Sequence, residues 1–263
     1  MSREVDLNKV ARQHLEMDSF FTGFAVRSRT EVHDDSAPGP ANPQSAIMSS
    51  RTTIRDRNPQ STADAAQELA AIAAEVARCR KCQLGSSRTN SVPGEGSPCA
   101  KIMFVGEAPG ADEDAQGRPF VGRAGQLLDK IIAACGLRRE EVFIGNILKC
   151  RPPENRDPRP EEIINCLPYL QMQIEAINPE IIVALGGHAA KTLLNTPKPI
   201  GQLRGQFQEY YGGIGRPPVK LMATFHPAYL LRSYTEQNRR YVWEDMKKVL
   251  TELGLPVPSR GTS

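Results

Sequence analysis

The sequence lacks any apolar run that approaches the ~20 residues needed to span a membrane. Its first residues, MSREVDLNKVARQHLEMD, have no apolar core of the kind that a secretory signal peptide needs, and their acidic residues argue against a transit peptide. Hydrophobic residues still make up 40% of the chain, which is enough to form a core. We therefore expect a soluble cytoplasmic protein with no membrane partner.

A strong excess of one charge is also missing. The formal net charge is +3, and residues 1–60 hold as many acidic as basic residues, so the excess lies in the rest of the chain. So small a positive charge permits binding to nucleic acid but does not require it.

Two phosphate-binding signatures are absent from the glycine-rich segment GEAPGADEDAQGRPFVGRAG, residues 106–125, which follows the apolar run KIMFV. The segment has neither the GxxxxGK[ST] pattern of a P-loop nor the GxGxxG pattern of a dinucleotide site. Its acidic residues would also repel a polyanion. We predict that it surrounds a neutral ring, for which Phe120 offers a stacking face and Asn146 an amide that donates and accepts hydrogen bonds.

Composition divides the chain into three parts. Residues 1–60 include stretches rich in Pro, Ser, Ala and Asn, which predicts a disordered or weakly helical extension. Residues 61–255 alternate apolar runs with amphipathic segments, which predicts one folded domain. Residues 256–263 are expected to form a flexible tail.

The alternation predicts an α/β fold, a three-layer α/β/α sandwich with a central, mainly parallel four-stranded sheet. The predicted strands are residues 101–105, 142–148, 180–185 and 219–224. Ligands of such folds bind at the carboxyl ends of the strands. We expect the loops there to bring together Glu107, Asp112, Glu113, Phe120, Asn146, His188 and His226. Within this group we interpret His188 as structural, and we interpret Asp112 and the nearby Asp114 as solvated loop acids.

Four of the six cysteines have the spacing of metal ligands. Cys79 and Cys82 form C-x2-C, and Cys150 and Cys166 form C-x15-C. In a reducing compartment, such clusters indicate a metal rather than disulfides. Four thiolates fit either zinc or a [4Fe–4S] cluster, although a zinc ribbon usually shows a second C-x2-C.

Three ordered motifs, together with these cysteines, resemble a known family. They are GEAPGADEDAQGRPFVGRAGQLLD, NILKCRPPENRDPRPEE and FHPAYLLR. The sequence resembles the family-4 uracil-DNA glycosylases of bacteria and archaea over residues 64–254. The resemblance implies a DNA repair enzyme of base excision repair that hydrolyses the N-glycosidic bond of uracil in DNA and leaves an abasic site.

The resemblance also implies a cofactor and a partner. The family's cysteine spacing carries a [4Fe–4S] cluster, whose ligands here would be Cys79, Cys82, Cys150 and Cys166. The expected partner is uracil-containing DNA, single- or double-stranded, bound by a monomer associated with the nucleoid. We interpret the cluster as structural, joining the helix at 64–78 to the loop after the second strand.

Uracil recognition is assigned by the same resemblance. Phe120 would stack on the flipped base, and Asn146 would donate to O4 and accept from N3–H, a pattern that cytosine reverses. His226 would donate to O2, where the departing uracil collects negative charge.

A carboxylate must orient the water that attacks the sugar. Family-1 enzymes carry an Asp at the position of Ala108, so here the family pattern offers Glu107 and Glu113 instead. We assign Glu113 to the water, and Glu107 and Ala108 to the pocket wall. Gly110 stands where family-1 enzymes have the Tyr that excludes thymine, so the exclusion of thymine needs another group.

Two segments are candidates for DNA contacts. Leu230, Leu231 or Arg232 would fill the space left by the flipped base, although both leucines fit a core position equally well. Basic side chains after the second strand would contact phosphates, although each of them fits a solvated loop almost as well. They are Lys149, Arg151, Arg156 and Arg159.

Other functions remain open from the sequence. A covalently crosslinking relative carries an Arg-Arg-Ile-His insertion that the loop CRPPENRDPRPEE lacks. A non-catalytic, metal-bearing nucleic-acid binding protein would not need both Asn146 and His226. A family-5-like relative would accept a broader range of bases, but the glutamate of GEAPG and the CRPPxNR loop favour family 4.

Overall fold

The computed structural model describes residues 62–212 and 217–259. The predicted N-terminal extension, residues 1–60, lies outside the described residues, as do residues 260–263 of the predicted tail. Residues 256–259 of that tail carry no helix or strand. None of the helices in the described ranges is long and apolar enough to cross a membrane.

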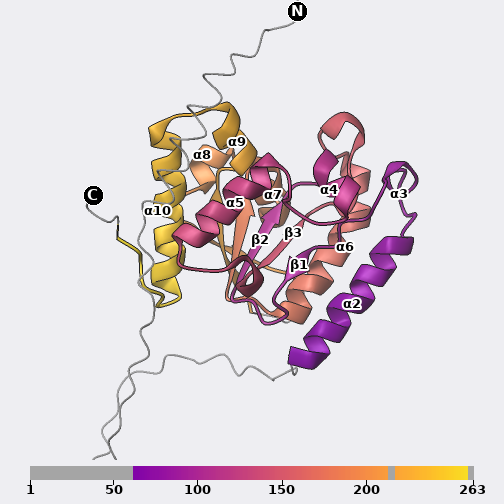
Figure 1. The fold of residues 1–263 in the computed structure, drawn as a ribbon, viewed down its shortest axis with the longest axis horizontal. Coiled ribbons are helices and arrows are strands. Elements are labelled where there is room, and N and C mark those ends of the chain that lie inside the picture. The colour runs from indigo at the N-terminus through magenta and orange to yellow at the C-terminus, as the bar shows by residue number, and fades with distance from the viewer. Residues whose placement is uncertain (1–61, 213–216, 260–263) are drawn as a thin grey trace, which may run out of the picture.

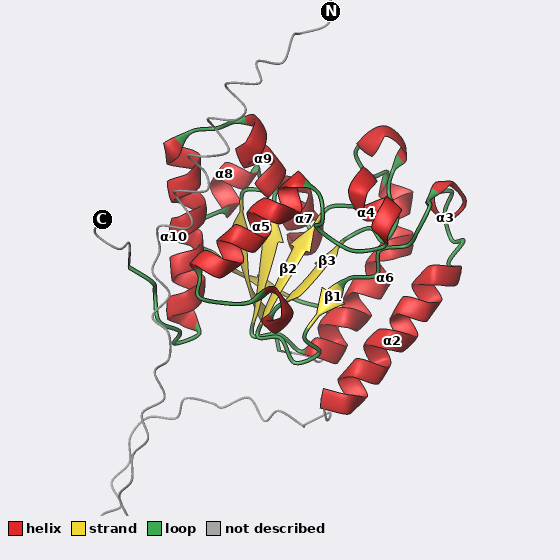
Figure 2. Ribbon diagram, viewed as in Figure 1, coloured by secondary structure: helices red, strands yellow, loops and turns green. Residues whose placement is uncertain are grey.

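Within the described residues, a mixed sheet of six strands forms the centre of the fold, with helices on both faces (Figure 1, Figure 2). The strands are β1 (Glu95–Gly96), β2 (Ile102–Gly106), β3 (Phe143–Asn146), β4 (Ile181–Leu185), β5 (Phe207–Tyr210) and β6 (Val219–Thr224). They lie in the order β1-β3-β2-β4-β6-β5. The four inner strands run parallel, and β1 and β5 pair antiparallel at the edges.

The prediction of an α/β fold with a mainly parallel core sheet is confirmed, and the two edge strands are added to the four that were predicted. Strand β1 has only two residues and includes Gly96 at φ +132°. Strand β5 buries only Tyr210. Neither has the continuous apolar pattern of a strand buried on both faces, so the sequence did not distinguish them from loops.

The helices form the two outer layers. The described elements are α2 (Thr62–Arg78), α3 (Leu84–Ser87), α4 (Ala111–Gln116), α5 (Arg123–Ala134), η1 (Arg139–Glu141), η2 (Pro153–Asn155), α6 (Pro160–Ile177), α7 (Gly187–Leu194), α8 (Ile200–Leu203), α9 (Pro227–Arg232) and α10 (Glu236–Glu252). Helices α5, α9 and α10 share a core with one face of the sheet, and α2, α6 and α7 share a core with the other.

Strand β2 shows how the sheet separates the two cores. Ile102 and Phe104 belong to the core that contains α5 and α10, whereas Met103 and Val105 belong to the core that contains α6 and α7. Successive side chains of a strand point to opposite faces, so both faces of the sheet are covered and each parallel strand must be apolar throughout. Polar function is therefore confined to the ends of the strands.

Candidate active site

A cavity of about 560 Å³ opens at the carboxyl ends of the parallel strands. The loops after β2, β3, β4 and β6 all contribute to its lining, as predicted for this edge of the sheet. It brings together all six residues predicted to bind uracil: Glu107, Ala108, Glu113, Phe120, Asn146 and His226. His188 also lines the cavity, whereas Asp112 is exposed on α4 and does not.

Gly106, the last residue of β2, allows Phe120 and Asn146 to approach each other. A Cβ atom at Gly106 would lie 2.4 Å from Asn146 Oδ1 and 2.6 Å from Phe120 Cζ, closer than real Cβ contacts. Gly106 pairs with Asn146 across the parallel strands β2 and β3. The first glycine of the glycine-rich segment therefore leaves room for two pocket side chains.

Phe120 is held in a strained backbone conformation by Arg139. Its φ is +50°, which is uncommon for a residue with a side chain. The guanidinium of Arg139 donates to the carbonyls of Pro119 and Phe120 at 2.5 and 3.2 Å. It also pairs with Glu95 at 2.8 Å and with Asp129 at 2.6 Å. These contacts fix the segment that presents the Phe120 ring to the cavity.

Asn146 lines the cavity and carries a buried, unpaired polar atom. The residue is 1% exposed, and its Oδ1 has no hydrogen-bond partner among the described residues. Leaving such an oxygen unpaired costs about 1–3 kcal/mol, so it needs an explanation. Its backbone carbonyl is held by Lys149 Nζ at 2.9 Å, which fixes the strand end. A hydrogen-bond donor supplied by a ligand would remove this cost.

His226 is held as a neutral hydrogen-bond donor. Its Nδ1 accepts the backbone N–H of Ala228 at 3.0 Å, so the proton of the neutral ring must lie on Nε2. Burial, with a smaller contribution from Arg232, lowers the pKa of His226 to about 4. The ring centroid lies 5.6 Å from that of Phe120. The position of His226 also requires a glycine in the loop after β4. A Cβ atom at Gly186 would lie 2.9 Å from His226 Cβ.

The carboxylate of Glu113 closes the glycine-rich loop. Oε2 accepts the backbone N–H of Gly110 at 3.0 Å, and Oε1 accepts those of Val121 and Gly122 at 2.8 and 2.9 Å. One side chain therefore joins the start of α4 to the residues that follow Phe120. This geometry gives Glu113 a part in shaping the loop.

Glu107 follows β2 directly and is half-buried at the cavity. Burial raises the pKa of Glu107 above its usual value, Asp157 raises it further, and His188 and Arg232 act in the opposite direction. Its carboxylate therefore sits among both acidic and cationic neighbours.

The comparison with known proteins agrees with this geometry. A family model described as the uracil DNA glycosylase superfamily matches residues 93–249. The chain belongs to the uracil-DNA glycosylase superfamily.

Curated relatives narrow the resemblance within this superfamily. A type-4 uracil-DNA glycosylase of Thermotoga maritima is 48% identical over 184 residues, which cover 69% of this chain and 93% of the relative. That of Saccharolobus solfataricus is 48% identical over 183 residues, 68% of this chain and 83% of the relative. A type-5 enzyme of Pyrobaculum aerophilum is 34% identical over 156 residues, 53% of this chain and 66% of the relative. The resemblance to the family-4 enzymes is confirmed.

The predictions that Leu230 and Lys149 contact DNA are wrong. Leu230 is 1% exposed and packs in the core beside α5 and α10, so it cannot enter a DNA stack. Lys149 is also 1% exposed, and its ammonium group is bound to the carbonyl of Asn146 and to Gln173 Oε1. Helix periodicity alone did not show which side of α9 faces inward, and a lysine after a strand is usually exposed.

Other predicted DNA contacts remain at the surface. Arg232 is exposed and lines the cavity, and Leu231 is partly buried against the core. Arg151 donates to Asn155 Oδ1 at 2.8 Å, and Arg156 is paired with Glu162 at 2.6 Å. Arg159 is exposed and lies 3.8 Å from Glu161. Their contacts with DNA stay predictions.

One loop acid was misinterpreted. Asp114 is 5% exposed, and its carboxylate accepts the backbone N–H of Thr89 at 3.0 Å. It therefore anchors the segment after α3 to α4 rather than facing solvent.

Arg139 was missed altogether, because its partners Glu95 and Asp129 are distant in sequence and leave no local pattern.

The four cysteines that were predicted to bind a metal line one cavity. Cys79, Cys82, Cys150 and Cys166 come from the end of α2, the turn before α3, the loop after β3, and α6. Arg88 Nη1 donates to Cys150 Sγ at 2.9 Å, and the backbone N–H of Lys149 donates to Cys166 Sγ at 3.2 Å. Hydrogen bonds of this kind stabilise metal-bound thiolates.

The sulfur atoms are spaced more widely than one zinc ion requires. Tetrahedral zinc with Zn–S bonds of about 2.3 Å holds its sulfurs about 3.8 Å apart. Among the described residues, one group of three His, Cys, Asp or Glu side chains has ligand atoms that all lie within 4.8 Å of one another. This group is Glu107, Asp157 and His188. No three of the described cysteine sulfurs are that close together.

Proposed function

We propose that this protein is a type-4 uracil-DNA glycosylase, which hydrolyses the bond between uracil N1 and the sugar C1′ and leaves an abasic site in DNA. Membership of the superfamily and the 48% identity to type-4 enzymes support this function. The observation that carries it is the buried, unpaired Oδ1 of Asn146 in a cavity that also holds Phe120 and the neutral His226.

Uracil is recognised after it has been flipped out of the DNA. The Phe120 ring covers one face of the base, and Asn146 Oδ1 accepts the N3–H of uracil while its amide donates to O4. Cytosine has an acceptor at N3 and a donor at N4, so it would leave both groups of Asn146 unpaired. The unpaired Oδ1 of Asn146 in the free protein supports this role, because uracil supplies the missing donor.

Departure of the base is helped by His226. As the N1–C1′ bond breaks, its electron pair remains on uracil and is delocalised onto O2. The Nε2–H of His226 donates to that oxygen, and the backbone N–H of Ala228 holds the ring in the required tautomer. A donor fixed in advance stabilises the anion without needing to reorganise.

We assign the orientation of the attacking water to Glu107, which reverses the roles predicted from sequence. The carboxylate of Glu113 already accepts three backbone N–H groups, whereas Glu107 is half-buried at the cavity. Glu107 faces the positively charged sugar, accepts a proton from the water, and lets its oxygen bond to C1′. Glu113 and Ala108 shape the wall of the pocket.

DNA contacts lie around this cavity. Arg232 on α9 and the partly buried Leu231 are positioned to fill the space left by the flipped base. Arg151 lies on the loop that follows Asn146, where it could contact a phosphate. We propose that the enzyme acts as a monomer on the DNA of the cytoplasmic nucleoid.

The cysteine site is proposed to hold a [4Fe–4S] cluster through Cys79, Cys82, Cys150 and Cys166. The resemblance to the family-4 enzymes supports a cluster over zinc, and the four cysteines that line one cavity, two of them with N–H donors, fit either group. When bound, the cluster supplies a rigid cross-link and no step of the hydrolysis. The Lys149 side chain lies next to this site and holds the carbonyl of Asn146, so the cross-link supports the end of β3.

A labelled oligonucleotide with one uracil tests this function. Under single-turnover conditions we expect release of free uracil and alkali-sensitive cleavage at that position, both lost in Asn146→Ala and His226→Ala. A band that resists denaturation would indicate the crosslinking relative instead. Binding without product, by protein that retains its metal, would indicate a non-catalytic binding protein.

A further inference from the structure

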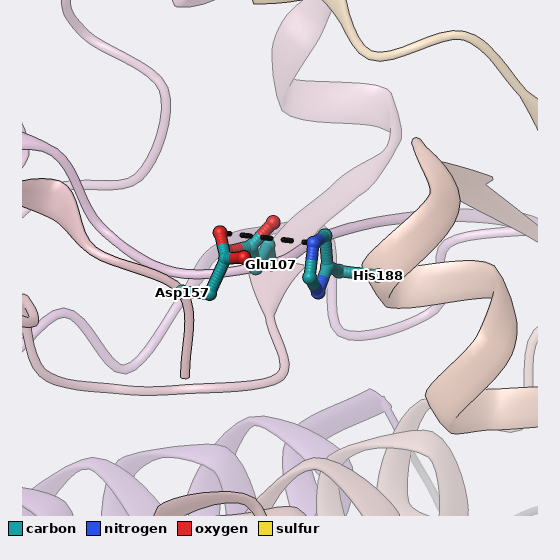
Figure 3. A group of neighbouring side chains, drawn as sticks. All are labelled: Glu107, Asp157 and His188. Atoms are coloured by element: carbon teal, nitrogen blue, oxygen red, sulfur yellow. Dashed lines mark ion pairs between the residues drawn. The ribbon is translucent and has the colours of Figure 1, made fainter. Parts of the chain in front are cut away.

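Three side chains gather at the cavity from separate segments of the chain. Glu107 follows β2, Asp157 follows η2, and His188 lies in the first turn of α7. Their carboxylate and imidazole ligand atoms all lie within 4.8 Å of one another. Figure 3 shows the two carboxylates side by side, facing the His188 ring, with the ion pair between Asp157 and His188 dashed.

We propose that His188 and Asp157 are positioning residues that set the charge of Glu107 in opposite directions during uracil excision. This inference rests on the proposed function, because it assumes that Glu107 orients the water. His188 was interpreted from sequence as a structural residue, and Asp157 was given no role.

The geometry favours an electrostatic role over a packing role. The side chains of His188 and Asp157 are 52% and 80% exposed, so neither contributes much to a core, and their closest atoms are 3.7 Å apart. Glu107 lines the same cavity and is half-buried, so solvent screens its charge less than the charges of the two exposed side chains.

The charged groups around Glu107 come from three elements. They are His188 on α7, Asp157 on the loop after η2 and Arg232 on α9. His188 and Arg232 favour the ionised form of Glu107, and Asp157 opposes it. Only the ionised form can accept a proton from water.

The pH dependence of kcat/KM on uracil-containing DNA tests the inference, because it reports ionisations of the free enzyme. We expect His188→Gln to move the acidic limb of the profile to higher pH by about half a unit, and Asp157→Asn to move it to lower pH by a similar amount. His188→Lys keeps the positive charge and should leave the limb near its wild-type position. A purely structural role would lower the rate without opposite shifts.

Matched controls separate these shifts from general effects of charge. Glu154→Gln removes an exposed acid from η2, just before the loop that carries Asp157, and should leave the limb unchanged. Raising the salt concentration should shrink both shifts, since exposed charges are screened. These assays contain EDTA, and one further series contains Mg²⁺ or Zn²⁺ in its place.

Several results would overturn the inference. If His188→Gln and Asp157→Asn keep the wild-type limb, the two residues do not tune Glu107. If the limb moves only when a divalent cation is added, the three side chains form a cation site instead. If both variants change only KM and its dependence on salt, they contact DNA. A wild-type protein that releases no uracil would refute the proposed function itself, whereas these other results would leave it standing.

Discussion

At the scale of single residues, Asn146 combines a structural cost with a proposed binding role. Its buried Oδ1 has no partner among the residues that the structure describes, so Asn146→Leu removes an unsatisfied oxygen and keeps a similar volume. We expect kcat/KM for uracil to fall by at least about a hundredfold, because the pocket then has no group that reads the base. Tm should fall by no more than about 3 °C. A variant with wild-type kcat/KM would show that Asn146 does not read uracil.

The neutral His226 predicts that the stability of the fold depends on pH. Its pKa is lowered from 6.5 to about 4 in the folded protein, so between these values the unfolded chain binds a proton that the folded chain does not. Stability should therefore decrease as the pH falls through this window. The contribution of His226 between pH 7 and pH 5 is about 2 kcal/mol.

A comparison of two proteins isolates this contribution. Replacing His226 by Gln removes the titrating group, so the decrease in Tm from pH 7 to pH 5 should be smaller in His226→Gln than in the wild type. His188→Gln, which changes an imidazole that is 52% exposed, is the matched control. Equal decreases in Tm for wild type and His226→Gln would contradict the neutral state of the half-buried His226.

At the scale of elements, Arg139 joins β1, α5 and the Phe120 segment. We expect Arg139→Met to release this segment, because it removes two carbonyl contacts and two ion pairs at a site that is 21% exposed. The expected results are faster hydrogen exchange over residues 117–123 and a kcat/KM lowered by about tenfold or more. Arg138→Met is the control, since Arg138 is 70% exposed and its ion-pair partners among the described residues are the nearby Glu140 and Glu141. Equal effects of the two substitutions would rule out this role for Arg139.

The elements also show what the sequence could predict. Four apolar runs were enough to identify the parallel strands, and strand ends were enough to gather Glu107, Phe120, Asn146 and His226 in one cavity. The pairing of Glu113 with backbone amides was not predictable, since it depends on how the loop closes in three dimensions. The burial of Lys149 was missed for a similar reason, because its partner Gln173 lies on α6, far along the chain.

At the scale of the whole molecule, the cysteine site links segments that the sheet alone does not join. The four cysteines connect α2, the turn before α3, the loop after β3, and α6, and α2 packs on the side of the sheet that carries α6. A bound metal group therefore ties this outer layer to the strand that ends at Asn146. Metal binding at such a site contributes directly to folding stability.

Loss of one metal ligand should therefore lower the stability of the whole fold, rather than act directly on the hydrolysis. We expect Cys150→Ser to lower the iron content from about four atoms per chain, to remove the visible absorbance of the cluster, and to lower Tm by more than about 5 °C. Cys99→Ser is the matched control, because Cys99 is exposed and lies outside the cavity. Purified wild-type protein with one zinc ion per chain and no iron would refute the cluster. Wild-type protein with iron, but with a Tm that Cys150→Ser leaves unchanged, would refute its role as a cross-link, since a cross-link between α2 and α6 must stabilise the fold that it holds together.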